Sequence, residues 1–399
     1  MSRQLQEAYI VSAVRTPVGK APRGMFRNTR PDDLLAHVIR GAVDRTPGLD
    51  QGQIEDAIIG CAMPEAEQGL NMARIGVLLA GLPDTVGGVT VNRFCASGLQ
   101  SVAMAADRIQ VGGADVMIAG GAESMSAIPM MGNRPSINPR CFSNDENVAI
   151  AYGMGITAEN VASRWKVSRE DQDAFSVESH ARALRAIEAG QFRDEILPYG
   201  IQERLPAADG RTIAVQERLA DTDEGPRPGT TQEALAGLRP VFAARGSVTA
   251  GNSSQMSDGA GAVVLMSERK VRELGIEPLA RFVSFSVAGV PPEIMGIGPI
   301  AAIPKALELA GLGLDDIDWI ELNEAFAAQS LAVIREVGLD PTKVNPCGGA
   351  IALGHPLGAT GAIRTATIVH GLRREGKRYG MVTMCVGTGM GAAGIIEVL

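Results

Sequence analysis

A chain of 399 residues is too long for one small module, and the usual domain sizes predict two or three packed units. Hydrophobic residues make up 45% of the chain and charged residues 21%, a balance that excludes a disordered protein. The formal net charge of -8 gives no overall basic field for nucleic acid or anionic lipid, so an anionic ligand must be held by a local cluster.

The first section of the chain alternates short apolar runs with helical patterns. We expect strands at about 8–14 and 57–59, with a helix at about 32–44 between them. A helical stripe over 96–110 then precedes a buried strand at 115–119. The order of strand, helix and strand implies parallel pairing, so this section predicts an α/β fold.

Residues 121–246 are denser in Pro, Gly and polar residues and predict a loop-rich insertion. Within it, Ser168-Arg-Glu-Asp171 is typical of a capping box, and it opens a helix that we expect to end at Gly190. The segment 221–229 contains too much Pro, Gly and Asp for regular structure. The insertion is therefore expected to be irregular with a few helices.

After residue 260 the order of the first section returns. Residues 317–322 match 54–59 as a strand after an acidic turn, and 379–384 match the strand that ends at Ala119. In each half a turn of small residues opens a long helix, at Cys95-Ala-Ser-Gly98 and at 355–361. This repetition predicts two similar halves related by a pseudo-twofold axis.

No apolar run reaches the roughly 20 residues that a membrane-spanning helix needs, and no basic leader precedes the first predicted strand. We therefore expect a cytoplasmic protein without a membrane partner. The cysteines lack the paired spacing of a metal site, which predicts free thiols in a reducing compartment and no bound metal. They are Cys61, Cys95, Cys141, Cys347 and Cys385.

The segment Val91-Asn-Arg-Phe-Cys95-Ala-Ser-Gly98 places a thiol after a predicted strand and at the first turn of a helix. Unpaired backbone N–H groups and the positive end of the helix dipole favour a thiolate at this point. We therefore expect the pKa of Cys95 to fall below about 8.5. The alternative is that Cys95 is a small buried hydrophobic residue.

A second motif, 348–361, carries His355 inside a glycine-rich turn rather than on an apolar face. An imidazole there can accept a thiol proton or donate to a developing oxyanion, whereas the alternative is a histidine that only stabilises the turn. Cys385 ends another predicted strand and is followed at once by a glycine turn at Gly387. Because ligand sites in α/β proteins gather where strands end, these side chains are candidates for one site.

Two further motifs leave choices open or are rejected. Asn323 follows the strand at 317–322, and it is either the N-cap of the next helix or a residue that holds a water or polarises a carbonyl. The run Gly389-Met-Gly-Ala-Ala-Gly394 matches the dinucleotide-binding fingerprint in letters. Only five residues follow it, so it has no helix for a pyrophosphate, and we reject a nicotinamide site there.

Taken together, the segments 91–98, 323–327, 348–361 and 385–394 closely resemble the thiolase family in order and spacing, over essentially the whole chain. Residues 91–100 and 246–259 look most like the bacterial 3-ketoacyl-CoA thiolases, also called acetyl-CoA acyltransferases. The resemblance implies a five-layered αβαβα thiolase fold. It divides the chain into an N-terminal half (1–120 and 247–275), an inserted loop domain that binds coenzyme A (121–246) and a C-terminal half (276–399).

By the same resemblance, the chain is an enzyme of fatty acid metabolism and β-oxidation that cleaves 3-ketoacyl-CoA with coenzyme A, or runs the reverse condensation of acetyl-CoA. Cys95 would carry the acyl group as a thioester intermediate, His355 would take its proton, and Cys385 would act as the second acid and base. His355 with a water on Asn323 would stabilise an enolate, and the backbone N–H groups of Cys95 and Gly387 would stabilise the tetrahedral intermediate. Ping-pong kinetics should follow.

The resemblance also implies which residues contact coenzyme A, which is substrate and product; no permanently bound cofactor is implied. Arg227 matches the family's adenine and phosphate contact and Ser254 its pantetheine contact. The residues that would line the tunnel are Met154, Ala250, Phe242, Ala325 and Phe326. Thr388 stands where many relatives have glycine. Acyl-CoA and acetyl-CoA are the implied partners, and a homodimer or homotetramer the implied assembly.

Two rival functions remain open. A ketosynthase shares the fold and nucleophile but typically uses two histidines, where this chain has Asn323 and Cys385. A non-enzymatic acyl-CoA carrier would use the same pocket without a reactive Cys95. A papain-like hydrolase would explain neither the second thiol nor the duplicated pattern.

Overall fold

The computed structural model describes residues 5–206 and 211–399. The first half contains five main strands in the spatial order β4-β3-β5-β8-β1, with β3 parallel to β4 and β5, and β8 antiparallel to β5 and β1. These strands are β1 (Ala8–Arg15), β3 (Asp56–Gly60), β4 (Val89–Val91), β5 (Val116–Ser124) and β8 (Ser257–Ser267). A short strand, β2 (Gly19–Lys20), also pairs with β8.

The second half repeats this arrangement. Its strand β10 pairs in parallel with β11, β11 pairs antiparallel with β12, and β12 pairs antiparallel with β9. A parallel bridge from Ile320 to Val344 stands where β3 meets β4 in the first half. The strands are β9 (Ala280–Gly289), β10 (Trp319–Leu322), β11 (Tyr379–Val386) and β12 (Met390–Glu397). The pairs Tyr9–Arg281 and Ile10–Ala280 connect the sheets of the two halves, through β1 and β9.

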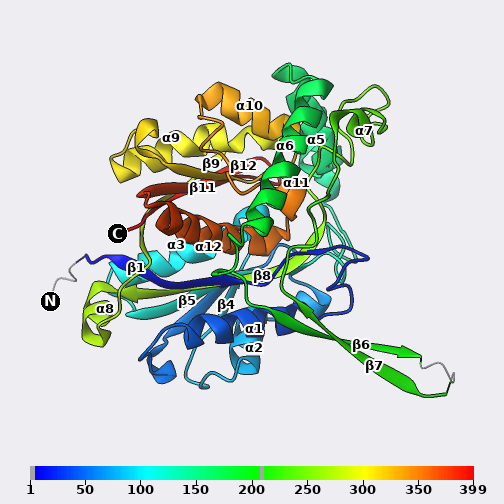
Figure 1. Ribbon diagram of the computed structural model, residues 1–399. Helices are drawn as coiled ribbons and strands as arrows, with labels where there is room; N and C mark the ends of the chain where they lie inside the picture. The colour runs from blue at the N-terminus through cyan, green and yellow to red at the C-terminus, as the bar shows by residue number, and fades with distance from the viewer. Residues whose placement is uncertain (1–4, 207–210) are drawn as a thin grey trace.

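Helices separate and cover the two sheets, as Figure 1 shows. Helices α1 (Pro31–Asp44) and α2 (Met72–Leu79) cover the outer face of the first sheet. Helices α9 (Gly298–Ala310) and α10 (Ala327–Val337) lie on the outer side of the second. Helices α3 (Ser97–Gln110) and α12 (Leu357–Glu375) pack between the sheets. The five layers confirm the expected αβαβα fold with two duplicated halves.

The two central helices approach each other closely because small residues lie between them. A Cβ atom on Gly98 would lie 2.7 Å from the backbone nitrogen of Ala362, and one on Gly361 would lie 2.0 Å from that of Leu99. Helix α12 is accordingly buried on nearly all sides, whereas the outer helix α1 leaves part of its surface in solvent. A helix that is buried all round belongs to the centre of a large core.

The insertion between β5 and β8 contains helices α4 (Asp145–Val148), α5 (Met154–Arg164), α6 (Arg169–Glu188) and α7 (Gln232–Ala236). It also contains an antiparallel hairpin of β6 (Tyr199–Pro206) and β7 (Ile213–Ala220), which projects from the body of the molecule in Figure 1. Two short helices outside it are α8 (Glu268–Leu274) and α11 (Ala350–Leu353). Single-turn 3₁₀ segments lie at 51–53, 66–68, 94–96, 139–142, 149–151, 292–297 and 314–316.

Most predicted elements are confirmed, including the helix that opens at Ser168, whose hydroxyl accepts a hydrogen bond from the Asp171 N–H. The irregular segment 221–229 and the absence of a helix after Gly389 are also confirmed, since 390–397 form β12. The interpretation of Asn323 as an N-cap is wrong, because α10 begins at Ala327 behind Phe326. The division of the chain into domains stays a prediction.

Along the described residues, no helix is both long and apolar enough to cross a membrane. The same residues contain no cluster of three or more His, Cys, Asp or Glu side chains suited to a metal ion.

Candidate active site

Cys95 lies at the junction between β4 and α3, in a 3₁₀ turn that leads directly into the helix. Phe94 adopts a φ of +43°, which is uncommon for a residue with a side chain and marks local backbone strain. The turn is held by the Asn92 side chain, which accepts from the Phe94 N–H at 2.8 Å, and by Ser97, whose hydroxyl donates to the Phe94 carbonyl at 2.7 Å. This turn presents the Cys95 sulfur to a pocket.

The pocket in front of Cys95 has a volume of about 440 Å³. Ala62, Phe94, Leu357, Gly387 and Thr388 of the two halves line it beside Cys95. The insertion contributes further lining residues. The wall residues from the insertion are mainly apolar: Met130, Met131, Gly132, Pro135, Ser136, Ile137, Ile150, Tyr152, Gly153 and Met154. An apolar cavity that ends at a nucleophilic atom is suited to an acyl group.

The Cys95 thiol is 9% exposed, and the prediction of a lowered pKa is wrong in this structure. Burial raises the pKa of Cys95 to about 12, while the backbone N–H groups of Gly387 and of Cys95 itself act in the opposite direction and the charge of Glu123 adds to the increase. The resting group is therefore a thiol that needs a base. The two N–H groups lie near the sulfur. When the sulfur attacks a bound carbonyl, the oxyanion forms beside the sulfur, within reach of these donors.

His355 is buried just before α12, and its ring is held from both sides. Its Nδ1 lies 2.6 Å from the Thr360 hydroxyl, which itself donates to the Pro356 carbonyl. The hydroxyl therefore accepts the Nδ1 proton, and Nε2 keeps a free electron pair. Burial and the charge of Arg364 lower the pKa of His355 to about 3, so the imidazole is neutral and is able to accept a proton.

Asn323 follows β10 and reaches the other side of the same imidazole. Its side-chain nitrogen lies 3.3 Å from His355 Nε2, and its backbone N–H donates to the Thr383 carbonyl at 2.9 Å. Its side-chain oxygen is buried and has no hydrogen-bond partner among the described residues. Because buried polar atoms normally have partners, this oxygen favours contact with a substrate or a water over a purely structural role.

Cys385 lies at the end of β11, two residues before the Gly387 N–H that points at Cys95. It is fully buried, and burial followed by the proximity of Cys95 raises its pKa above the usual range. The turn after it contains Thr388 at a φ of +63°, a conformation that favours glycine. Cys385 is thus a protonated thiol adjacent to the nucleophile.

The residues predicted to contact coenzyme A fall into two groups. Met154, Ala325 and Phe326 pack in one apolar cluster with Cys385. Phe242 meets the ring of Phe326 edge-on at 6.2 Å, and the Ser254 N–H donates to the Ala325 carbonyl at 2.9 Å. These contacts place five of the seven predicted residues in or against the cluster that contains Cys385.

The other two predicted contacts lie apart from that cluster. Ala250 is exposed in the loop before β8. Arg227 is exposed on the irregular segment after β7, where its backbone N–H lies 3.2 Å from the Nδ1 of His180. The hydrogen bonds of its backbone lead to His180 and Thr230 rather than to the other six residues, so its role rests on the family resemblance.

Sequence reasoning missed two residues that shape this site. Thr360 lies within the glycine-rich motif 348–361, five residues after His355. This short separation was the one indication that its hydroxyl could reach the imidazole. Glu123 follows the predicted strand that ends at Ala119, and nothing in the local sequence indicated that its carboxylate would reach the start of α12.

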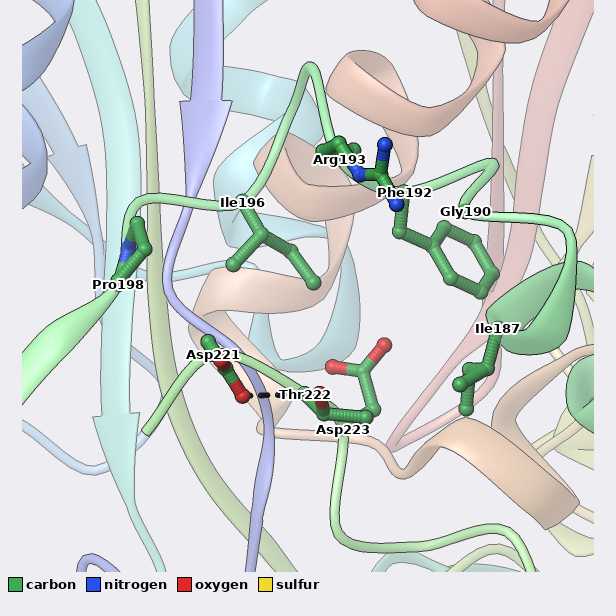
Figure 2. Close-up of a pocket in the computed structure, with 9 residues that line it drawn as sticks. All are labelled: Ile187, Gly190, Phe192, Arg193, Ile196, Pro198, Asp221, Thr222 and Asp223. Atoms are coloured by element: carbon green, nitrogen blue, oxygen red, sulfur yellow. Dashed lines mark hydrogen bonds between the residues drawn. The ribbon is translucent and has the colours of Figure 1, made fainter. Parts of the chain in front are cut away.

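A second pocket, of about 320 Å³, lies between the end of α6 and the segment after β7, away from Cys95. Figure 2 shows Asp221, Thr222 and Asp223 on one side and Phe192 and Arg193 on the other. The carboxylate of Asp223 is already engaged by the buried Arg15 guanidinium at 2.7 and 2.9 Å. The residues that line this pocket include no cysteine or histidine, so the pocket at Cys95 is the candidate active site.

Comparisons with known proteins agree with this geometry. The model of the thiolase N-terminal domain matches residues 8–269, and that of the thiolase C-terminal domain matches 276–398. The chain is 54% identical to a 3-ketoacyl-CoA thiolase of Bacillus subtilis, over 98% of this chain and 100% of that protein. It is 47% identical to the peroxisomal 3-ketoacyl-CoA thiolase B of Mus musculus, over 98% and 91% of the two chains.

Solved structures give the same result. The acetyl-CoA acetyltransferase of Bacillus anthracis superposes with a TM-score of 0.89 at 42% identity, covering 100% of both chains. The dimeric peroxisomal thiolase of Saccharomyces cerevisiae superposes with a TM-score of 0.88 at 41% identity, covering 99% of this chain and 98% of that one. With both halves matched and the fold shared along its full length, the chain belongs to the thiolase family.

Proposed function

We propose that the chain is an acetyl-CoA C-acyltransferase that cleaves 3-ketoacyl-CoA with coenzyme A through an acyl-Cys95 intermediate. The observation that carries this proposal is Cys95 in the lining of a mainly apolar pocket, with the backbone N–H groups of Gly387 and of Cys95 itself near its sulfur. The relatives named as 3-ketoacyl-CoA thiolases support the same activity.

In the first half-reaction, His355 Nε2 accepts the Cys95 proton as the sulfur attacks the 3-keto carbonyl. The bond between C2 and C3 then breaks, the acyl group stays on sulfur as a thioester, and the electron pair passes to the acetyl-CoA enolate. Cys385 donates its proton to C2 of that enolate, and acetyl-CoA leaves. A neutral imidazole beside two protonated thiols has the charge state that these transfers need.

In the second half-reaction, the thiol of coenzyme A loses its proton to the Cys385 thiolate and attacks the thioester. Acyl-CoA leaves, and the Cys95 sulfur regains its proton from His355. The N–H groups of Cys95 and Gly387 stabilise the tetrahedral intermediates, while His355 and a water on Asn323 stabilise the enolate. Splitting the reaction through an acyl-enzyme replaces one difficult displacement with two easier ones.

Thiolysis of 3-ketoacyl-CoA substrates from C4 to C16, in wild type and Cys95→Ser, tests this proposal. Wild type should show ping-pong kinetics and an acyl adduct on Cys95 by intact-protein mass spectrometry. Cys95→Ser should lose the adduct and at least roughly a thousandfold in rate, since removing a nucleophile costs on this scale or more. Undiminished turnover in Cys95→Ser would point to another mechanism, and wild type that shows neither turnover nor an adduct on Cys95 would point to the carrier. Turnover of malonyl-CoA without acetyl-CoA would point to a ketosynthase.

We propose that coenzyme A binds along the insertion, with Arg227 near its adenine and phosphates and Ser254 near its pantetheine. The apolar group formed by Met154, Phe242, Ala325 and Phe326 would line the tunnel, with Ala250 at its exposed side. The position of four of these residues around Cys385 supports a pantetheine arm that ends at the two thiols.

A homodimer or homotetramer is the proposed assembly. Strand β4 ends the sheet of the first half and has a partner on only one side among the described residues, with Val89 exposed on it. Such an edge is a natural place for pairing with another chain. The dimeric yeast thiolase provides a precedent. Sedimentation equilibrium would contradict the assembly if it returned the mass of one chain.

A cytoplasmic location is proposed on the basis of the cysteines. All five are free thiols in the structure, as expected in a reducing compartment. Fractionation of cells that produce the protein, followed by immunoblotting, tests the location, and recovery outside the cytoplasmic fraction would contradict it.

A further inference from the structure

Glu123 is a carboxylate 1% exposed in the central layer, at the end of β5. Its Oε2 accepts from the backbone N–H of Ala62 at 2.7 Å and from that of Gly358 at 2.8 Å. Its Oε1 accepts from the Gln68 side chain at 2.6 Å and from the Met63 N–H at 3.3 Å. One side chain thus connects the loop after β3 with the first turn of α12.

These donors belong to the walls of the candidate site. Ala62 and Met63 line the pocket in front of Cys95, and so does Leu357, the residue before Gly358. His355 precedes Gly358 by three residues, in the turn that enters α12. The space between the two walls is too small for side chains, since a Cβ on Gly358 would lie 2.6 Å from the Cys61 Cα. Glu123 therefore fixes a contact between backbones.

The start of α12 depends on this carboxylate. Pro356 is the N-cap residue and makes no side-chain cap, and the first turn contains no acidic residue. The first N–H groups of a helix have no partners within it and attract negative charge. Glu123 supplies that partner from another part of the chain, at the position of Gly358.

The start of the other central helix is arranged differently. The N–H of Gly387, just past the end of β11, points at the Cys95 sulfur before α3. In each case a segment at the end of a strand meets the start of the central helix from the other half. At α3 the segment after β11 contributes the Gly387 N–H as a donor beside Cys95. At α12 the end of β5 contributes the Glu123 carboxylate as an acceptor for the Gly358 N–H.

We propose that Glu123 is a positioning residue for the acyl transfer, which holds the His355 turn and the first turn of α12 against the pocket wall at Ala62 and Met63. The inference rests on the proposed function of Cys95 and His355. Loss of the carboxylate lets the two walls separate, so that Nε2 no longer meets the Cys95 proton at the required distance. Small misplacements of this kind cost up to about a hundredfold in rate.

The test compares Glu123→Gln, Glu123→Asp and Val77→Ala with wild type in the thiolysis assay. Glu123→Gln should lower kcat by roughly ten- to a hundredfold. It should leave the KM for coenzyme A within about twofold, because the hydrogen bonds of Glu123 lead to neither Arg227 nor the apolar group proposed to line the coenzyme A tunnel. Glu123→Asp keeps the charge but withdraws it by one methylene, and should give an intermediate kcat. Val77 is a fully buried residue of α2 outside the site, and its truncation controls for lost stability.

A wild-type kcat in folded Glu123→Gln would overturn the inference, as would a loss of kcat no larger than that of Val77→Ala at a matched shift in melting temperature. A rise in the KM for coenzyme A that accounts for the whole loss of kcat/KM would also overturn it. If Glu123→Gln does not fold, Glu123→Asp decides by the same criteria. Cys95→Ser in parallel separates the two proposals: if that variant retains activity, the proposed function fails independently of Glu123.

Discussion

The central layer and the insertion position their candidate residues by different means. Cys95, His355 and Cys385 are buried and lie where strands end or helices begin, so the backbone of the duplicated core determines their geometry. Arg227 and Phe242 lie in irregular segments of the insertion and are exposed. The difference fits the proposed division of roles, in which the core supplies the reacting groups and the insertion binds coenzyme A and lines the pocket.

The strongest test of the role of the core removes the second thiol. Cys385→Ser should lower thiolysis by about 10²- to 10⁴-fold, because the enolate loses its general acid. Transfer of an acyl group from a simple acyl-CoA to Cys95 forms no enolate, and the coenzyme A thiolate that leaves needs no strong acid, so this transfer should fall much less. Intact-protein mass spectrometry after incubation with acyl-CoA measures the transfer, and loss of both activities together would mean that Cys385 supports the fold instead.

Asn323→Ala tests the oxyanion role within the same layer. We expect turnover to fall by about a hundredfold or more, since removal of one such donor has an effect of this size in other enzymes. The backbone bond from Asn323 to Thr383 is unaffected by the substitution, so the melting temperature should change little. Steady-state kinetics with a 3-ketoacyl-CoA provide the measurement, and an unchanged rate refutes the role.

The raised pKa of Cys95 predicts a particular pH dependence of alkylation. Only the thiolate reacts with iodoacetamide, and with a pKa of about 12 its fraction grows roughly tenfold for each pH unit between 7 and 10. Peptide mapping should therefore show a rate at Cys95 that keeps rising, while the same cysteine in unfolded protein reaches a plateau above about pH 9. A plateau below about pH 8 in the folded protein would indicate a preformed thiolate.

The insertion should give the smallest effect. Arg227→Ala should raise the KM for coenzyme A several-fold and leave kcat unchanged, because an exposed guanidinium contributes on the order of 1 kcal/mol to holding a phosphate. The difference should shrink at high salt, which screens exposed charges. Arg239→Ala, at another exposed arginine of the insertion, is the matched control. An equal change in both variants would show that net charge matters rather than the position of Arg227.

Features of the fold that depend on residues close together in the chain could be predicted from the sequence. Short apolar runs located β1, β3 and β5, a helical stripe located α3, and the repeated strand order led to the duplicated halves. The capping residue of α6 was also found, because a side chain that caps a helix acts within three residues. Motif spacing and family resemblance together brought Cys95, His355 and Cys385 into one candidate site.

Features that depend on distant contacts could not be read from local patterns. The hairpin β6–β7 was missed because Ile213, Val215 and Leu219 are exposed, so no buried face produced a clear strand signal beside the turn residues. The pKa of Cys95 was predicted in the wrong direction, since the helix start was visible in the sequence and the depth of burial was not. The partners of Glu123 lie 61 and 235 residues away along the chain.

The buried Arg15 connects the insertion to the core, and this connection affects how the protein unfolds. Its guanidinium pairs with Glu195 at 2.6 Å and with Asp223 at 2.7 Å, at two separate points of the inserted segment, while Arg15 itself ends the first strand of the core. Separation of the insertion from the core would break both ion pairs of Arg15 at once. The insertion and the core should consequently melt in a single cooperative transition, despite the very different texture of their sequences.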